Sequence, residues 1–134
     1  MITVYIPKMK QEWIDDLFES ESEFKKEALN QIRTVSEQYN RILLKMESKG
    51  AITLNDGKLL MKDDLQKMEW GQSCENCISL EIGDKFAKRL LDIVPLISYA
   101  LGNKYKTPES WMHDFIEEWL IDKLVKKQSS EWED

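Results

Sequence analysis

The sequence predicts an α+β domain, mostly α, with four to five helices around a small antiparallel sheet that includes a β-hairpin. Long stretches carry an apolar residue every three or four positions, and short stretches alternate apolar with other residues; these are the periodicities of helices and strands. The 134 residues suit a single domain, because one core commonly serves about 100–200 residues. We expect this domain to span residues 1–128 and the acidic segment 129–134 to fray.

The N-terminal residues predict a strand and a short helix. Residues 2–6 alternate large aliphatic with other side chains before Pro7, which is typical of a strand. Residues 8–19 then carry apolar side chains four positions apart, as an amphipathic helix does. Ser20 and Glu23 have the spacing of a capping box, so we expect a second helix to begin there.

The strongest helical pattern covers residues 22–49 and ends before Gly50, the residue type that most often terminates a helix. This helix forms either the spine of the domain or a coiled-coil seam that makes a homodimer, and we favour the spine. Replacing Tyr39 with Glu distinguishes the two, because it would unfold a spine but only separate a dimer. The stripe consists of Phe24, Ala28, Ile32, Val35, Tyr39, Ile42 and Met46.

The middle of the chain predicts most of the sheet. Alternating side chains around the turn Asn-Asp-Gly at 55–57 predict a hairpin over 51–61, because these turn residues tolerate positive φ. A short helix over 64–70, ended by Gly71, is expected to follow. Residues 78–82 alternate again, and we expect this strand to join the hairpin, since a hairpin alone is marginally stable.

The C-terminal part predicts two further helices. Asp84 opens the first, which has apolar residues on more than one face and should be the most buried helix. Pro95 lies inside it and should kink it, and Gly102 follows its end. Thr107, followed by a proline and an acidic residue, is a typical helix start. We therefore expect the last helix to run from 108 to about 127.

The sequence carries no pattern that predicts an enzyme or a cofactor. His113 is the only histidine, so a catalytic triad or Cys-His pair would depend on it. Its place at the edge of the last helix's apolar stripe suits a boundary residue better than a catalytic base. The five glycines form none of the loops that cradle phosphates. We expect a non-enzymatic protein without a cofactor or a metal.

The apolar segments predict a cytoplasmic protein with no part in the membrane. The most apolar stretch, 90–101, contains an Asp and a Pro and is too short to span a bilayer. The first residues lack the basic start and the small-residue cleavage site of a secretory signal.

Cys74 and Cys77 form a Cys-x-x-Cys motif, which occurs in half zinc sites and in redox dithiols. A structural zinc needs four ligands, and the chain has no second motif of this kind. A redox dithiol normally lies at a helix start, whereas this motif precedes a predicted strand. We favour two reduced thiols, with a metal-binding or redox protein built on Cys74 and Cys77 as the alternative.

The uneven charge suggests the function. Residues 8–23 carry six acidic and two basic side chains, residues 24–62 four and eight, and residues 63–134 fifteen and nine. With five tryptophans, the acidic ends suit a non-enzymatic protein-binding module, namely an inhibitor, immunity-type or regulatory protein that occludes a partner with a basic surface. The candidate contact residues are Asp15, Asp16, Glu19, Glu117, Glu118, Glu131, Trp132 and Glu133.

The basic middle segment supports an alternative, a DNA-binding transcriptional regulator. Its long helix followed by a hairpin has the order of a winged helix's recognition helix and wing. The net charge of −6 makes this alternative the less favoured one, because DNA-binding domains are normally basic. The candidate nucleic-acid face consists of Arg33, Arg41, Lys45 and Lys49.

Overall fold

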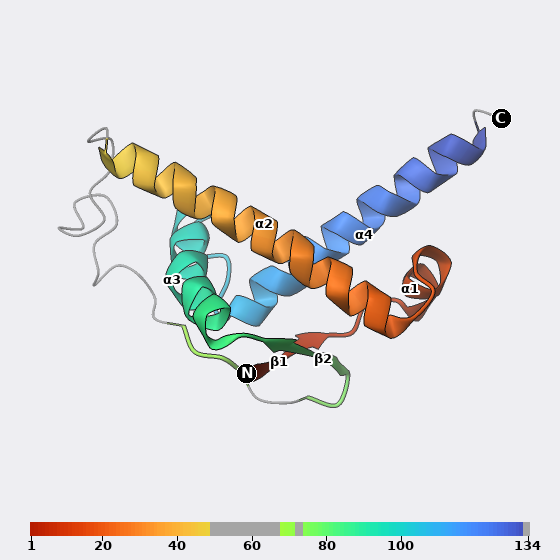
Figure 1. Ribbon diagram of the computed structural model, residues 1–134, viewed down its shortest axis with the longest axis horizontal. Coiled ribbons are helices and arrows are strands. Elements are labelled where there is room, and N and C mark those ends of the chain that lie inside the picture. The colour runs from red at the N-terminus through yellow and green to blue at the C-terminus, as the bar shows by residue number, and fades with distance from the viewer. Residues whose placement is uncertain (49–67, 72–73, 133–134) are drawn as a thin grey trace.

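The computed structural model describes residues 1–48, 68–71 and 74–132. In this part of the chain, four helices and a two-stranded antiparallel sheet form an α+β fold that is mostly α, as predicted. Figure 1 shows the two longest helices, α2 (Glu21–Ser48) and α4 (Pro108–Trp132), crossing on one side of the sheet. The helices α1 (Gln11–Leu17) and α3 (Asp84–Ala100) lie toward opposite ends of this crossed pair.

The sheet joins the two strands β1 (Ile2–Pro7) and β2 (Cys77–Ile82), which come from distant parts of the chain. Their antiparallel register sets Val4 opposite Leu80 and Ile6 opposite Ile78, so the buried side chains of both strands share one face. The predicted strand over 78–82 is therefore present, but its described partner is the N-terminal strand. The predicted hairpin over 51–61 lies outside the described residues.

The connection from the sheet to the helices differs slightly from the prediction. The backbone N–H of Lys8 donates to the carbonyl of Asn76 at 2.9 Å, which continues the ladder one residue past Pro7, and α1 begins only at Gln11. The predicted cap at Ser20 is confirmed, while the return bond of the capping box reaches the N–H of Glu19 and not that of Ser20. The Ser20 hydroxyl accepts the N–H of Glu23 at 3.1 Å, and the Glu23 carboxylate accepts the N–H of Glu19 at 3.1 Å.

The first half of α2 is a spine of the domain, as favoured by its sequence. Phe24, Ala28, Ile32 and Ser36 recur every four residues and are fully buried, because residues four apart share a helix face. Tyr39, by contrast, is 40% exposed, and Figure 1 shows α2 continuing past α3. The spine thus ends near Ser36, and the side chains of Ile42 and Met46 are outside the described part.

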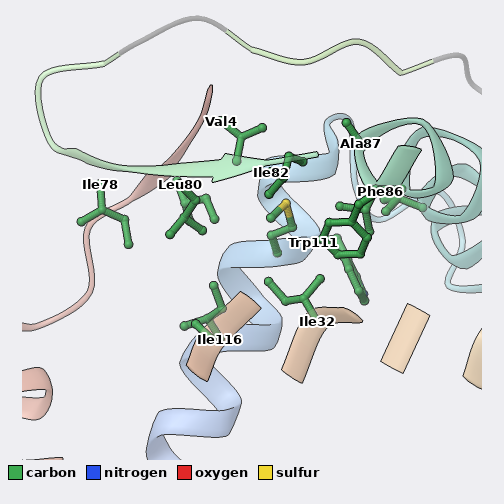
Figure 2. Packing of buried hydrophobic residues seen from close by; sticks show 14 of the residues in the cluster. Val4, Ile32, Ile78, Leu80, Ile82, Phe86, Ala87, Trp111 and Ile116 are labelled. Carbon is green, nitrogen blue, oxygen red and sulfur yellow. The ribbon is translucent and has the colours of Figure 1, made fainter. Parts of the chain in front are cut away.

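The core lies between the inner face of the sheet and the helices. Figure 2 shows Ile78, Leu80 and Ile82 pointing from β2 toward α4, where Ile116 lies. Side chains on several faces of α3 are buried in the core, which agrees with the prediction that this helix is strongly buried. Its α3 members are Phe86, Ala87, Leu90, Ile93, Val94 and Ile97.

The turn between α3 and α4 has its expected stop and start signals. Gly102 and Asn103 follow the end of α3 with φ of 76° and 60°, the left-handed conformation that glycine and asparagine adopt most readily. The Thr107 hydroxyl accepts the N–H of Ser110 at 3.2 Å and caps α4, as predicted. The helix α3 continues through Pro95, which lies inside it.

Two predicted boundaries are wrong. The helix α4 extends to Trp132 and not only to about residue 127, because a formed helix propagates easily and no glycine or proline follows Lys127. Residues 68–70, predicted as the end of a short helix, are not helical. Met68 is instead buried in the core, and Gly71 is held by a side chain of α4.

Candidate functional site

The acidic residues of α1 are partly engaged within the chain. The carboxylate of Asp16 lies 3.0 Å from the Lys127 ammonium, which also donates to the carbonyl of Asp16 at 3.0 Å. Asp15 accepts a hydrogen bond from Gln11 at 2.9 Å, and Glu19 is exposed. Since the attraction between Asp16 and Lys127 already neutralises one predicted contact residue, α1 contributes less negative surface than its sequence suggests.

The two adjacent glutamates of α4 have different surroundings. Glu118 is exposed, whereas Glu117 is half-buried with its carboxylate 3.6 Å from Nε2 of His113. Glu117 therefore has an imidazole neighbour within the chain, although its side chain is still 43% exposed. Successive helical residues diverge by about 100°, so Glu117 lies beside His113 while Glu118 is exposed.

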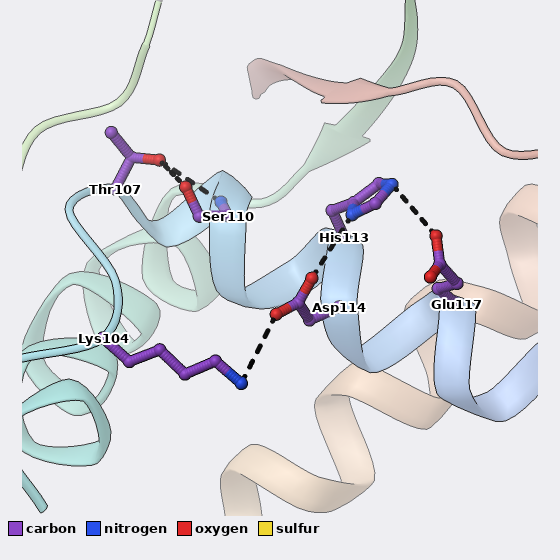
Figure 3. A network of polar contacts seen from close by, with 6 residues as sticks. All are labelled: Lys104, Thr107, Ser110, His113, Asp114 and Glu117. Carbon is purple, nitrogen blue, oxygen red and sulfur yellow. Dashed lines mark hydrogen bonds and ion pairs between the residues drawn. The ribbon is translucent and has the colours of Figure 1, made fainter. Parts of the chain in front are cut away.

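Figure 3 shows a polar cluster at the start of α4, with His113 between two carboxylates. His113 Nδ1 lies 3.5 Å from Asp114, and Asp114 in turn lies 3.9 Å from the ammonium of Lys104. Burial, supported by a hydrogen bond to Asp114, raises the pKa of Tyr105, so its hydroxyl stays protonated. The distances from the His113 ring to Asp114 and Glu117 are longer than those of good hydrogen bonds. His113 is a half-buried boundary residue, as predicted.

The C-terminal contact residues are only partly described. Glu131 and Trp132 belong to the last turn of α4, but the structure does not describe their side chains. Glu133 lies outside the described residues.

The alternative basic face is also partly engaged. Arg33 lies over the ring of Phe86 at 5.1 Å, and the neighbouring Glu37 forms an ion pair with Arg89 of α3 at 3.8 Å. Arg33 therefore serves the contact between α2 and α3. Arg41 is exposed, the side chain of Lys45 is not described, and Lys49 lies outside the described residues.

Cys74 and Cys77 form a disulfide with a Cα–Cα distance of 5.5 Å. The expectation of two reduced thiols is therefore wrong for this structure. The physical reason lies in the chain path: residues 75 and 76 form a turn directly before β2, which brings the two cysteines to a separation typical of a disulfide. The ring is short, so the bond restricts the unfolded chain less than one closing a long loop.

A buried carboxylate that the sequence analysis did not single out holds the segment before the disulfide. Glu109, in the first turn of α4, is 7% exposed, and its Oε2 accepts the backbone N–H of Gly71. Burial raises the pKa of this carboxyl, although its hydrogen bonds oppose the shift. The sequence marks Glu109 only as the acidic residue of a typical helix start, since nothing in the sequence indicates its burial.

The clearest exposed apolar surface lies on the C-terminal half of α4. Ile121 is 42% and Val125 is 55% exposed, and both lie one turn apart on the same side of the helix. Glu118 and Asp122, both exposed, have the spacing that places them on this side as well. We call these four residues, Glu118, Ile121, Asp122 and Val125, the distal face of α4.

The distal face is uncovered because α1 packs on the other side of α4. Trp119 contacts Phe18 with ring centroids 5.7 Å apart, and the Lys123 ammonium lies 5.4 Å from the Trp119 ring. Lys127 holds Asp16 further along. Ile121 and Val125 are each two positions from Lys123, about 200° around the helix, and therefore point away from α1.

Comparisons with protein-family models, with curated proteins and with solved structures found no match. None of the described helices combines the length and apolarity needed to cross a bilayer. Within the described part of the chain, His, Cys, Asp and Glu residues form no group of three or more that would hold a metal ion.

Proposed function

We propose that this chain is a non-enzymatic protein-binding module that docks its partner on the distal face of α4. The observation that carries the proposal is the exposure of Ile121 and Val125 on a helix whose opposite side is packed. Because Ile121 and Val125 are 42% and 55% exposed, covering the rest of each side chain in a complex is favourable by on the order of 1 kcal/mol, roughly half the value for a fully exposed side chain. The helix is already formed and anchored, so little ordering entropy opposes binding.

The charges of the distal face suggest the chemistry of the partner. Glu118 and Asp122 each precede one of the two aliphatic residues by three positions. Ile121 and Val125 can therefore act as two apolar anchors one turn apart, as on a helix that lies in a groove, with an acidic side chain beside each. Asp122 is paired with Lys126 at 2.9 Å, whereas no ion pair is described for Glu118. We infer a partner groove that is apolar at its floor and basic along one edge.

This mode of binding fits an inhibitor, immunity-type or regulatory protein, because a helix seated in a groove occludes it. The net charge of −6 would speed encounter with a basic partner by electrostatic steering. The engaged residues Asp16 and Glu117 are less suited to this role than Glu118, since their carboxylates already have cationic or imidazole neighbours.

Site-specific photo-crosslinking in the native host tests the proposal. A photoreactive amino acid is placed at Ile121 or Val125, with the exposed Lys88 of α3 as the matched control position. We expect the same single protein to be crosslinked from both α4 positions and not from Lys88. The purified partner should then bind the wild-type chain but lose roughly tenfold or more in affinity for the Ile121→Glu, Val125→Glu variant.

Equal crosslinking from Lys88, or unaltered affinity of a folded double variant, would contradict the proposal. DNA binding is the alternative outcome. It predicts salt-dependent affinity for duplex DNA that falls on Arg41→Glu and is insensitive to the two α4 substitutions.

A further inference from the structure

We propose that Cys74 and Cys77 form a reversible thiol–disulfide site, reduced by an external dithiol that attacks the sulfur of Cys74. The proposal concerns the turn before β2 and is independent of the distal face of α4. It rests on three features of this turn: the exposure of its residues, the way the neighbouring sheet is held, and the small size of the disulfide ring.

The first feature is access. Cys74, Glu75 and Asn76 are exposed, whereas Cys77 is half-buried at the start of β2. Thiol–disulfide exchange requires a thiolate to reach one sulfur in line with the bond. The more exposed Cys74 is the sulfur that an incoming thiolate reaches, which leaves Cys77 as the leaving group.

The second feature is that β2 does not depend on the disulfide for its position. Its residues pair with β1 from Ile82 to Cys77, and the carbonyl of Asn76 accepts the N–H of Lys8 at 2.9 Å. Ile78, Leu80 and Ile82 are buried in the core. Opening the disulfide therefore frees Cys74 and the turn while the strand stays paired, so both redox states keep the fold.

The third feature is the ring size. The two cysteines are three positions apart, and a cross-link this short removes little entropy from the unfolded chain. A disulfide that contributes little to stability is not explained as a structural staple. Exposed disulfides are also the ones most readily reduced, and this pair combines both properties.

The exchange proceeds in two balanced steps. One thiolate of the external dithiol attacks Sγ of Cys74, the bond between the two cysteine sulfurs breaks, and its electron pair leaves on the sulfur of Cys77, which takes a proton from water. The second thiol of the external dithiol, as thiolate, then attacks the mixed disulfide and releases Cys74, which is also protonated. The protein gains two electrons and two protons, and the external dithiol becomes a disulfide.

To test the inference, the oxidised full-length protein is equilibrated in a series of buffers that differ in the ratio of reduced to oxidised dithiothreitol. Free thiols are trapped with a maleimide after acid quenching and counted by mass spectrometry, and circular dichroism is recorded at each ratio. We expect two thiols to appear together while the helical signal is unchanged. A disulfide that opens only in denaturant, or a helical signal that is lost together with it, would overturn the proposal.

The two single serine variants test the order of attack. Cys77→Ser leaves the exposed Cys74, and Cys74→Ser leaves the half-buried Cys77 as the matched control. We expect oxidised glutathione to modify the Cys77→Ser variant roughly tenfold faster, because access limits cysteine reactivity. Equal rates, or a faster reaction of the Cys74→Ser variant, would refute the assignment of Cys74 as the attacked sulfur.

Discussion

The backbone N–H of Gly71 donates a hydrogen bond to the carboxylate of Glu109, which is 38 residues further along the chain. This bond fastens the segment before β2 to the first turn of α4. Met68 is buried and Trp70 packs against the core, so apolar contacts and the Glu109 carboxylate together hold this segment against the body of the protein. The second carboxylate oxygen, Oε1, is buried without a hydrogen-bond partner among the described residues, which makes the charged form of Glu109 costly.

The stability conferred by Glu109 should depend on pH. Its carboxyl has a pKa of 4.5 when free, and burial raises the pKa in the folded protein. The folded state therefore binds the proton more tightly, so the stabilising contribution is complete below the unfolded pKa and is lost as pH rises through the folded pKa. Glu109→Gln cannot titrate and keeps an oxygen that accepts the Gly71 N–H. We expect its stability relative to the wild type to increase as pH rises through this window.

Urea unfolding of both proteins across that pH range measures the difference. Because both chains share all other titratable groups, their contributions cancel in the comparison. A stability difference that is constant, or that shifts in favour of the wild type as pH rises, would rule out the raised pKa of Glu109.

Gly71→Ala should destabilise the protein by about 1–3 kcal/mol, the cost of leaving a buried polar group without its partner. A Cβ at position 71 would collide with Oε2 of Glu109 and push the carboxylate from the N–H. The test is a double-mutant cycle with Glu109→Ala, read by urea unfolding. We expect Gly71→Ala to cost much less in the Glu109→Ala background, because the colliding group is gone. Additive costs would contradict this account.

Ser98→Ala should weaken the connection between α3 and α4. The Ser98 hydroxyl accepts the N–H of Tyr105 and donates to its carbonyl, both at 2.9 Å, and both residues are buried. Alanine satisfies neither group, so we expect a loss of about 1–3 kcal/mol in the free energy of unfolding. Ser79→Ala on the exposed face of β2 is the control and should change it by less than about 0.5 kcal/mol.

The spine of α2 should be sensitive at Ile32 and tolerant at Tyr39. Ile32→Ala removes a fully buried side chain and should cost about 2–5 kcal/mol. Tyr39→Glu should cost less than about 1 kcal/mol, because Tyr39 is 40% exposed. The expectation that Tyr39→Glu unfolds a spine is thereby revised. Thermal unfolding compares the two variants, and a severe loss of stability in Tyr39→Glu would show that the spine extends beyond Ser36.

Sedimentation of wild-type protein and Tyr39→Glu addresses the homodimer. The buried stripe of α2 is occupied by the chain's own core as far as Ser36, so a coiled coil would have to use the rest of the helix. A wild-type dimer that Tyr39→Glu separates into folded monomers would establish that seam.

Local signals in the sequence predicted the elements well. The four-residue spacing of Phe24, Ala28 and Ile32 predicted the packed face of α2. The capping residues Ser20 and Thr107 predicted helix starts that the structure confirms. Each of these features depends on residues within one or two turns of one another. Such interactions are visible in the sequence because their geometry is that of the helix itself.

Several features of the candidate sites depend on contacts between distant residues and could not be predicted. The partner of β2 is the N-terminal strand, the Lys127 ammonium neutralises Asp16 of α1, and Ile121 is exposed because α1 covers only the other side of α4. Sequence periodicity shows which side of an element is apolar but not what packs against it.

By itself the sequence determined the helices, the two described strands, the main caps and the acidic balance of the protein, since these follow from local conformational preference and composition. Only the tertiary structure decided which charges are neutralised, which apolar residues are left exposed on α4, and that Glu109 is buried against Gly71. The physical reason is that desolvation and pairing depend on neighbours that folding brings together across the chain. The proposed docking surface and the redox site therefore rest on the tertiary structure.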